Sequence, residues 1–187
     1  PYSEAFAIFV SEKYEYRDSG GVLSKDVIKK IDAFLRIIKL KNKDDDVISF
    51  DISDQKKCFI IKVKNKFDTW WPQESGGSFS SYLKKFQYIK KIDLYPDTLD
   101  LNGDKLANFF SEFIFGFNLK SYTFNKYKTL NKEKINKKIS FNIISSYKIK
   151  IEKDYKYYDA IKEGVFLTRE LVSEPPNVLN PKKYTEE

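Results

Sequence analysis

The sequence predicts an α/β fold, a three-layer sandwich in which helices cover both faces of a mixed, mostly parallel sheet. Short apolar segments alternate along the chain with longer segments of helical periodicity, which is the pattern of βαβ units. Two of the short segments are separated by only a few residues, which indicates one antiparallel hairpin in the sheet. With 187 residues, of which 41% are hydrophobic, the chain is large enough for one domain with a substantial core.

Five segments have the apolar character of strands. They are Ala5–Val10, Val47–Ile52, Cys58–Lys64, Ile89–Tyr95 and Lys138–Ser145. The first is apolar without alternation, so we expect it to be buried on both faces. The second and third form the expected hairpin. Alternation in the third predicts a drier face with Phe59, Ile61 and Val63, and a wetter face with Cys58, Ile60, Lys62 and Lys64.

Four longer segments predict helices, and local signals mark their ends. The predicted segments are a helix that follows the N-cap Ser24, a short stretch at Phe79–Tyr88, a helix that opens at Asn102 and a long helix at Asp154–Glu174. The third carries an aromatic stripe at helical spacing, which is typical of a core helix. Pro175 and Pro176 end the fourth, because proline cannot continue a helix. Asn180 and Pro181 then predict the start of another helix.

Two short motifs resemble ligand loops but lack the residues that such loops need. Ser75-Gly-Gly-Ser78 is predicted to be a flexible turn before a helix, where backbone N–H groups can bind phosphate. It lacks the Lys-Ser/Thr of a P-loop and the third glycine of a dinucleotide motif. Lys43-Asp-Asp-Asp46 lacks the alternating ligands, the glycine and the distal glutamate of an EF-hand, so it predicts a solvated turn.

The positive charge is concentrated in one segment. The net charge is +7, and residues 120–150 hold nine lysines and one acid, Glu133, with Tyr122, Phe124 and Tyr127 among the lysines. Such a segment could stack bases and neutralise phosphates. It could also be a loop and an edge strand protected by lysines. The second interpretation is favoured because only three of the 34 basic residues are arginine, the residue that suits phosphate and guanine best.

The composition excludes several classes of site. The chain contains no histidine and one cysteine, Cys58. Histidine-based metal sites, Ser-His-Asp triads, Cys-His dyads and intramolecular disulfides are therefore excluded within it. A single cysteine suits a reducing compartment, and no apolar run approaches the length of a membrane span. The chain begins with Pro1 and contains no methionine, so we expect it to be a piece of a longer protein.

Two separated segments resemble the M17 leucyl aminopeptidases, also called cytosol aminopeptidases. Residues 166–184 read Phe-Leu-Thr-Arg-Glu-Leu-Val-Ser-Glu-Pro-Pro-Asn-Val-Leu-Asn-Pro-Lys-Lys-Tyr and resemble that family's junction between two domains, with Ser173 in place of the usual asparagine. Residues 121–129 read Ser-Tyr-Thr-Phe-Asn-Lys-Tyr-Lys-Thr and resemble a Tyr-x-Phe-x-x-Tyr-Lys segment of the family's N-terminal domain. Residues 1–120 match only weakly in sequence, but they match in the order of strands and helices.

The resemblance implies a domain organisation and an activity. Residues 1–151 would be a macro-domain-like N-terminal domain, 152–174 a connecting helix and 175–187 the start of an absent catalytic domain. The full-length protein would be a cytoplasmic metallo-aminopeptidase that releases N-terminal amino acids from peptides with two divalent ions, Zn²⁺ or Mn²⁺. The family's catalytic and metal-binding motifs do not occur here, so no catalytic, metal-binding or cofactor-binding residue is assigned in this chain.

The family resemblance also implies a role in assembly or regulation. Family members form hexamers, and such a role for this domain requires an apolar patch on the connecting helix or on the sheet edge. The alternative is a stand-alone module that binds nucleic acid or ADP-ribose through Gly76, Gly77 and residues 120–150. A third possibility is a scaffold whose downstream domain has lost its metal ligands. No membrane partner is expected.

Overall fold

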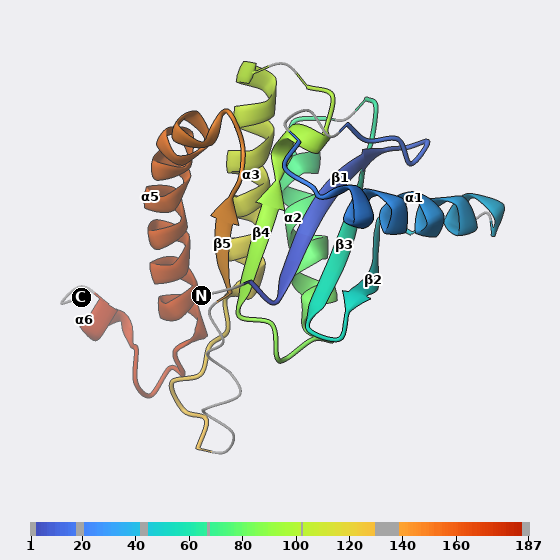
Figure 1. Ribbon diagram of the computed structural model, residues 1–187. Coiled ribbons are helices and arrows are strands. Elements are labelled where there is room, and N and C mark those ends of the chain that lie inside the picture. Colours follow the sequence, from blue (N-terminus) through green and yellow to red (C-terminus); the bar gives the residue numbers. More distant parts are fainter. Residues whose placement is uncertain are drawn as a thin grey trace.

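A mixed sheet forms the centre of the molecule, and its strand order is β2-β3-β1-β4-β5 (Figure 1). The computed structural model describes residues 3–17, 21–41, 45–66, 68–101, 103–129 and 139–184. The strands are β1 (Ala5–Ser11), β2 (Val47–Ser53), β3 (Lys56–Val63), β4 (Lys91–Tyr95) and β5 (Ser140–Ile143). β2 pairs with β3 antiparallel, and the other three pairings are parallel. The predicted mixed, mostly parallel α/β fold is confirmed.

The central strand β1 explains why the sheet forms as it does. Six of its seven residues are buried, so the uninterrupted apolar run Ala5–Val10 lies between two neighbours and beneath helices on both faces. All five predicted strands occur within a few residues of their expected bounds, although Lys138, at the start of the last predicted strand, lies outside the described residues.

Helices cover the two faces of the sheet unequally. α1 (Lys25–Leu40) lies on one face, and its N-cap Ser24 accepts the predicted hydrogen bond from the Val27 N–H at 3.4 Å. α2 (Trp71–Leu83) and α3 (Gly103–Ser121) cover the other face and pack on each other. α5 (Lys148–Ser173) packs on α3, outside the three layers (Figure 1). The shorter η1 (Pro96–Thr98) and α6 (Pro181–Tyr184) complete the described helices.

The prediction of a wetter face on β3 is wrong. Phe59, Ile61 and Val63 contribute to the core beneath α2 and α3, as the alternation predicted. Cys58 and Ile60, on the opposite face, are also buried, because they belong to a second core that α1 completes. Lys62 is buried as well, and only Lys64, just after the strand, is exposed as predicted. The Cys58 side chain is completely buried, and this burial raises the pKa of its thiol.

The prediction of a flexible turn at Ser75-Gly-Gly-Ser78 is also wrong. These residues lie inside α2, which begins at Trp71 with Pro72 in its first turn. A Cβ atom on Gly76 would lie 1.9 Å from the carbonyl oxygen of Phe113, and one on Gly116 would lie 2.0 Å from that of Gln73. The glycines therefore let the backbones of α2 and α3 touch, a tertiary requirement that outweighs the poor helix propensity of glycine.

Candidate functional site: the helix α5

α5 is a long helix whose side chains are mostly exposed to solvent, so most of it lies outside the core. It is 26 residues long, begins at Lys148 rather than at the predicted Asp154, and ends at Ser173, just before the two prolines. Only Ile151 is buried along its whole length. A helix held by so little apolar burial needs other contacts to position it.

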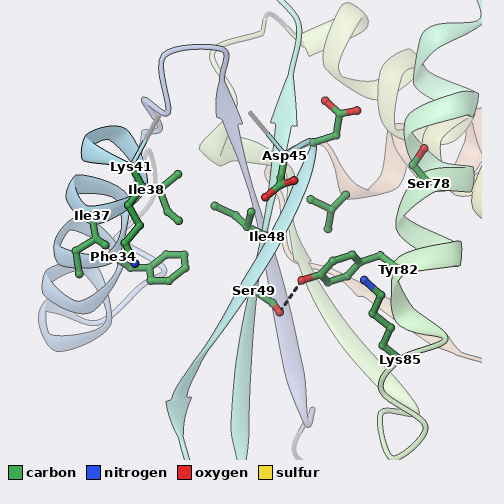
Figure 2. Close-up of a pocket in the computed structure, with 12 residues that line it drawn as sticks. Phe34, Ile37, Ile38, Lys41, Asp45, Ile48, Ser49, Ser78, Tyr82 and Lys85 are labelled. Atoms are coloured by element: carbon green, nitrogen blue, oxygen red, sulfur yellow. Dashed lines mark hydrogen bonds between the residues drawn. The ribbon is translucent and has the colours of Figure 1, made fainter. Parts of the chain in front are cut away.

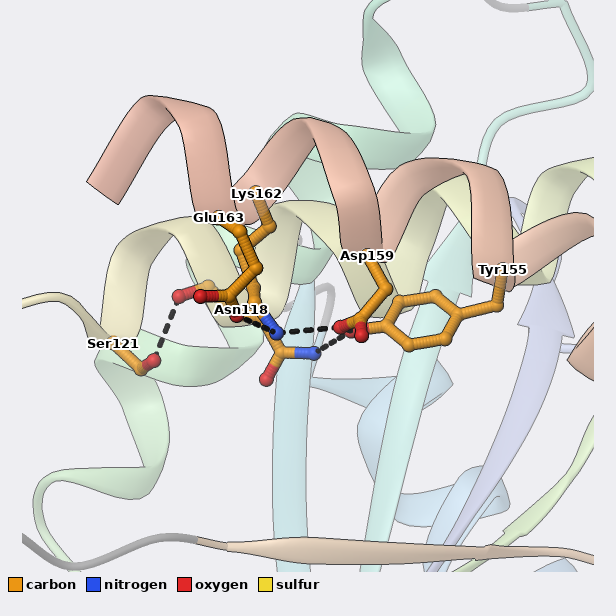
Figure 3. Close-up of polar contacts among 6 residues, drawn as sticks. All are labelled: Asn118, Ser121, Tyr155, Asp159, Lys162 and Glu163. Atoms are coloured by element: carbon orange, nitrogen blue, oxygen red, sulfur yellow. Dashed lines mark hydrogen bonds and ion pairs between the residues drawn. The ribbon is translucent and has the colours of Figure 1, made fainter. Parts of the chain in front are cut away.

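Polar side chains provide these contacts on the face of α5 that meets α3 (Figure 3). The Asn118 amide donates to the Tyr155 hydroxyl at 2.7 Å, and this hydroxyl donates to an Asp159 carboxylate oxygen at 3.1 Å. The Lys162 ammonium lies 2.5 Å from Asp159 and 3.2 Å from the neighbouring Glu163. The hydrogen bond from Asn118 to Tyr155 thus crosses from α3 to α5, and the other contacts order the polar side chains of α5 beside it.

Glu112 is the buried member of this interface. It interrupts the aromatic stripe of α3, is 7% exposed, and accepts hydrogen bonds from the Tyr158 hydroxyl at 3.0 Å and the Asn108 amide at 3.1 Å. Burial, with the negative charge of Glu112, raises the pKa of Tyr158 to about 12. Sequence reasoning missed this residue, although an acid within a run of phenylalanines was a visible signal.

The two motifs that carry the family resemblance contact each other. The rings of Tyr122 and Phe166 have centroids 5.1 Å apart. The Arg169 guanidinium lies over the Tyr122 ring and donates to the Leu119 carbonyl at 2.7 Å. The two motifs therefore meet where the segment after α3 contacts the second half of α5.

Glu174, at the end of α5, adds a polar contact with the segment that follows α3. It pairs with the Lys126 ammonium at 2.5 Å and accepts a hydrogen bond from the Tyr127 hydroxyl. Hydrogen bonds from these two side chains hold the pKa of the Glu174 carboxyl below its usual value. At Asn180, the side chain accepts from the Lys183 N–H at 3.0 Å, as the predicted N-cap requires.

The opposite side of α5 carries exposed apolar side chains. We call these the outer face of α5: Ile149, Tyr157, Ile161, Leu167 and Val172. Their exposed fractions run from 37% to 84%, and their spacing places them within one side of the helix. A Cβ atom on Gly164, between them, would meet nothing within 4 Å. The outer face is therefore a row of exposed apolar side chains along α5, of the kind found in interaction surfaces.

Three of the five described lysines in the Lys-rich segment pair with acids, whereas Lys120 lines a cavity with Lys84 and Arg169. Lys148 lies 3.9 Å from Glu152, Lys150 pairs with Asp104, and Lys126 pairs with Glu174 as described. β5, within this segment, is an edge strand, as the favoured interpretation predicted. Residues 130–138 lie outside the described residues. With Gly76 and Gly77 inside α2, the phosphate loop of the alternative hypothesis is not formed.

The described residues do not fit a metal ion. Among them, no group of three or more histidine, cysteine, aspartate or glutamate residues is arranged to hold one. In the part of the chain that the structure describes, no helix combines the length and the apolar character that a membrane span requires.

Sequence comparison finds related proteins. No family model matches the chain. A probable cytosol aminopeptidase from Agrobacterium fabrum is 35% identical over 117 residues, which are 60% of this chain and 22% of that protein. A probable cytosol aminopeptidase from Phytoplasma mali is 34% identical over 124 residues, 64% of this chain and 23% of that protein. The matches thus span under a quarter of the length of these curated relatives.

Solved structures share the fold. A mutant of tomato leucine aminopeptidase superposes with a TM-score of 0.72 at 19% identity, over 98% of this chain and 38% of that one. The bottromycin maturation enzyme BotP superposes with a TM-score of 0.63 at 10% identity, over 99% of this chain and 36% of that one. Together, the sequence matches and the shared fold confirm the resemblance of this chain to the N-terminal domain of the leucyl (cytosol) aminopeptidases.

Proposed function

We propose that this chain is the non-catalytic N-terminal domain of a leucyl (cytosol) aminopeptidase, and that α5 connects it to the catalytic domain. Residues 1–151 would form the domain, 152–174 the connector, and 175–187 the start of the catalytic domain. The probable cytosol aminopeptidases that it resembles are more than four times as long as the matched region. The contact between the two family-like motifs supports this organisation, because it fixes the direction in which the chain leaves α5.

The role that we propose for the domain is assembly of the full-length enzyme. The observation that carries this proposal is the outer face of α5, where Ile149, Leu167 and Val172 are more than half exposed, the last two near the end of the helix. Apolar side chains gathered on one helix face are typical of surfaces that bind another protein surface. A homo-oligomer, a hexamer by resemblance to the family, would bury this face.

The chemistry of the whole protein would depend on residues beyond this chain. The resemblance implies a two-metal exopeptidase in the cytoplasm, and its Zn²⁺ or Mn²⁺ ions would polarise the scissile carbonyl and activate water. The described residues of this chain do not group into such a site, so we assign none of them to catalysis.

The activity is tested by comparing two lengths of the protein. The chain extended downstream by about 300 residues, the size of a large domain, should hydrolyse leucine amide in the presence of Mn²⁺ and lose this activity in chelator. The 187-residue chain should be inactive under both conditions. Absence of metal-dependent turnover in the longer protein would overturn the proposal of an active aminopeptidase and leave a scaffold.

The assembly role is tested on the outer face of α5. The double variant Ile161→Ser, Val172→Ser should reduce the sedimentation coefficient of the longer protein, because it removes apolar area from the proposed interface. The matched control, Lys156→Ser with Glu170→Ser, changes two exposed polar residues of the same helix that lie outside the outer face and should leave assembly intact. Equal assembly of both variants would show that the outer face is not the interface.

A further inference from the structure

The edge strand β2 offers backbone hydrogen-bonding groups to a partner. Its ladder partner among the described residues is β3, in the register Val47 opposite Ile61. The Lys62 N–H donates to the Asp46 carbonyl at 2.9 Å, so Asp46 and Lys62, which lie next to the pair Val47 and Ile61, form a hydrogen-bonded pair. Since such pairs alternate along an antiparallel ladder, the N–H and C=O groups of Val47 and Ser49 point away from β3.

A groove runs along this edge between two helices (Figure 2). The cavity has a volume of about 600 Å³. Phe34 and Ile37 of α1 line one wall, and Tyr82 of α2 and Lys85, in the turn after it, line the other. Because α1 and α2 cover opposite faces of the sheet, a cavity that both helices line must pass the edge of β2. The outward backbone groups therefore lie at the bottom of a recess.

The first half of β2, Val47 to Phe50, lacks the usual protection of an edge strand, whereas Asp51 and a pairing irregularity follow in the second half. The sequence of β2, Val-Ile-Ser-Phe-Asp-Ile-Ser, contains no proline and no lysine, and the irregularity in its pairing comes only at Asp51–Ser53. Val47 and Ile48 are less than 9% exposed, so the side chains are covered while the backbone edge borders the groove. Proteins use such an edge to bind an extended peptide as an additional strand.

The charges around the groove are of both signs. Asp45 and Asp46 precede the strand, whereas Lys41 and Lys85 lie on the two walls. The Lys85 ammonium lies 4.7 Å from the centroid of the Tyr82 ring, at the rim of the α2 wall. Mixed charge does not suit a polyanion such as nucleic acid, but it matches a short peptide whose ammonium and carboxylate ends are both free.

We propose that this groove binds short extended peptides with free ends, which add to the sheet beside Val47 and Ser49. A single strand fits the recess between α1 and α2, and a second copy of the chain at this edge is one of the outcomes that the test below distinguishes. Main-chain hydrogen bonds would provide most of the affinity, so the groove would accept many side-chain sequences. This inference does not depend on the proposed activity or on α5.

Titration of the isotope-labelled 187-residue chain with the peptide Thr-Val-Thr-Val, followed by amide NMR, tests the proposal. The Val47 and Ser49 amides should shift in a saturable manner with a dissociation constant below about 1 mM. The same peptide with acetylated and amidated ends should bind about three- to tenfold more weakly, because it lacks both charges. Absence of shifts at these amides, or shifts without saturation, would overturn the proposal.

Two variants of one residue separate the backbone contact from the side chain. Ser49→Pro removes an N–H that points out of the sheet, which an edge strand tolerates, and should weaken binding at least about tenfold. Ser49→Ala keeps this N–H, loses only the hydroxyl contact with Tyr82 (3.1 Å), and should bind like the original chain. Thermal unfolding of both variants checks that the sheet is intact.

Two further outcomes would overturn the proposal. Equal binding by the folded Ser49→Pro and Ser49→Ala variants would show that the peptide does not pair with this edge. Shifts of the Val47 and Ser49 amides on dilution of the chain alone, with a change in sedimentation, would show instead that a second copy covers the edge.

Discussion

α3 and α5 lie side by side but are held in the protein by different forces. In α3, eleven residues between Leu106 and Phe117 are buried, whereas in the longer α5 only Ile151 is. α3 is therefore stabilised by apolar burial within this domain, and α5 by hydrogen bonds, ion pairs and ring contacts along one face. The difference shows that a helix can be positioned by a domain without belonging to its core, which leaves its outer face available to another surface.

The largest expected effect is in the aromatic core of α3. Phe113 is fully buried against the rings of Phe9 and Phe79, so Phe113→Ala should lower the free energy of unfolding by about 4 kcal/mol. Leu167→Ala, on the outer face of α5, should change it by less than about 0.5 kcal/mol, because Leu167 is 62% exposed. Urea unfolding of both variants measures the contrast, and similar costs would contradict it.

The close contact of α2 with α3 is expected to be nearly as sensitive. Gly76→Ala would place a methyl group 1.9 Å from the Phe113 carbonyl oxygen, and the helices would have to separate, at a cost of about 3 kcal/mol. Gly77→Ala is the matched control, since its Cβ would meet its nearest neighbours at 3.8 Å, and it should be neutral or stabilising. Differential scanning calorimetry separates the two outcomes, and a stable Gly76→Ala variant would mean that the helices are not in backbone contact.

A smaller effect is expected at the polar interface. Tyr158→Phe removes the hydroxyl that donates a hydrogen bond to Glu112 and leaves the buried carboxylate with one hydrogen bond fewer. This should lower the free energy of unfolding by about 1 kcal/mol. Tyr157→Phe changes a neighbour that is 69% exposed and should cost almost nothing. Chemical denaturation compares the pair. Equal stability of the two variants would show that the hydrogen bond from Tyr158 to Glu112 does not stabilise the protein.

The smallest effect is expected at the end of α5, and it should depend on pH. Because hydrogen bonds from Lys126 and Tyr127 lower the folded-state pKa of Glu174 below its unfolded value, the contact stabilises the protein above the unfolded pKa. This stabilisation is lost as the pH falls through the lowered pKa. Glu174→Gln should therefore narrow the stability difference between pH 6 and pH 3, as thermal unfolding at both values would show. An unchanged difference would contradict this role.

The sequence predicted the sheet and most helices because their signals are local. The apolar run Ala5–Val10, the Ser24 cap and the aromatic stripe of α3 each identify an element without knowledge of its neighbours. The start of α2 and the role of Gly76 could not be predicted in this way, because the glycine is required by the approach of another helix. The dry second face of β3 likewise depends on α1, which is distant in sequence.

The candidate site was predicted in its parts but not as a unit. The segments 121–129 and 166–184 were recognised separately, and only the folded chain shows that Tyr122 meets Phe166 and Arg169. Glu112 was hidden within a stripe assigned to the core, since periodicity does not reveal which position faces a later helix. The groove beside β2 depends on three elements at once, and no short motif encodes it.

The burial of Cys58 gives the chain an internal reporter of its own opening. The chain contains a single thiol, which is fully buried, and its raised pKa keeps it protonated at neutral pH. A thiol reagent can therefore react only after α1 separates from β3, and every labelled sulfur in this chain is Cys58. The rate of labelling would report openings of the core between β3 and α1 and would not respond to movements of α5. Labelling of this chain can therefore distinguish partial unfolding of the domain from separation of α5.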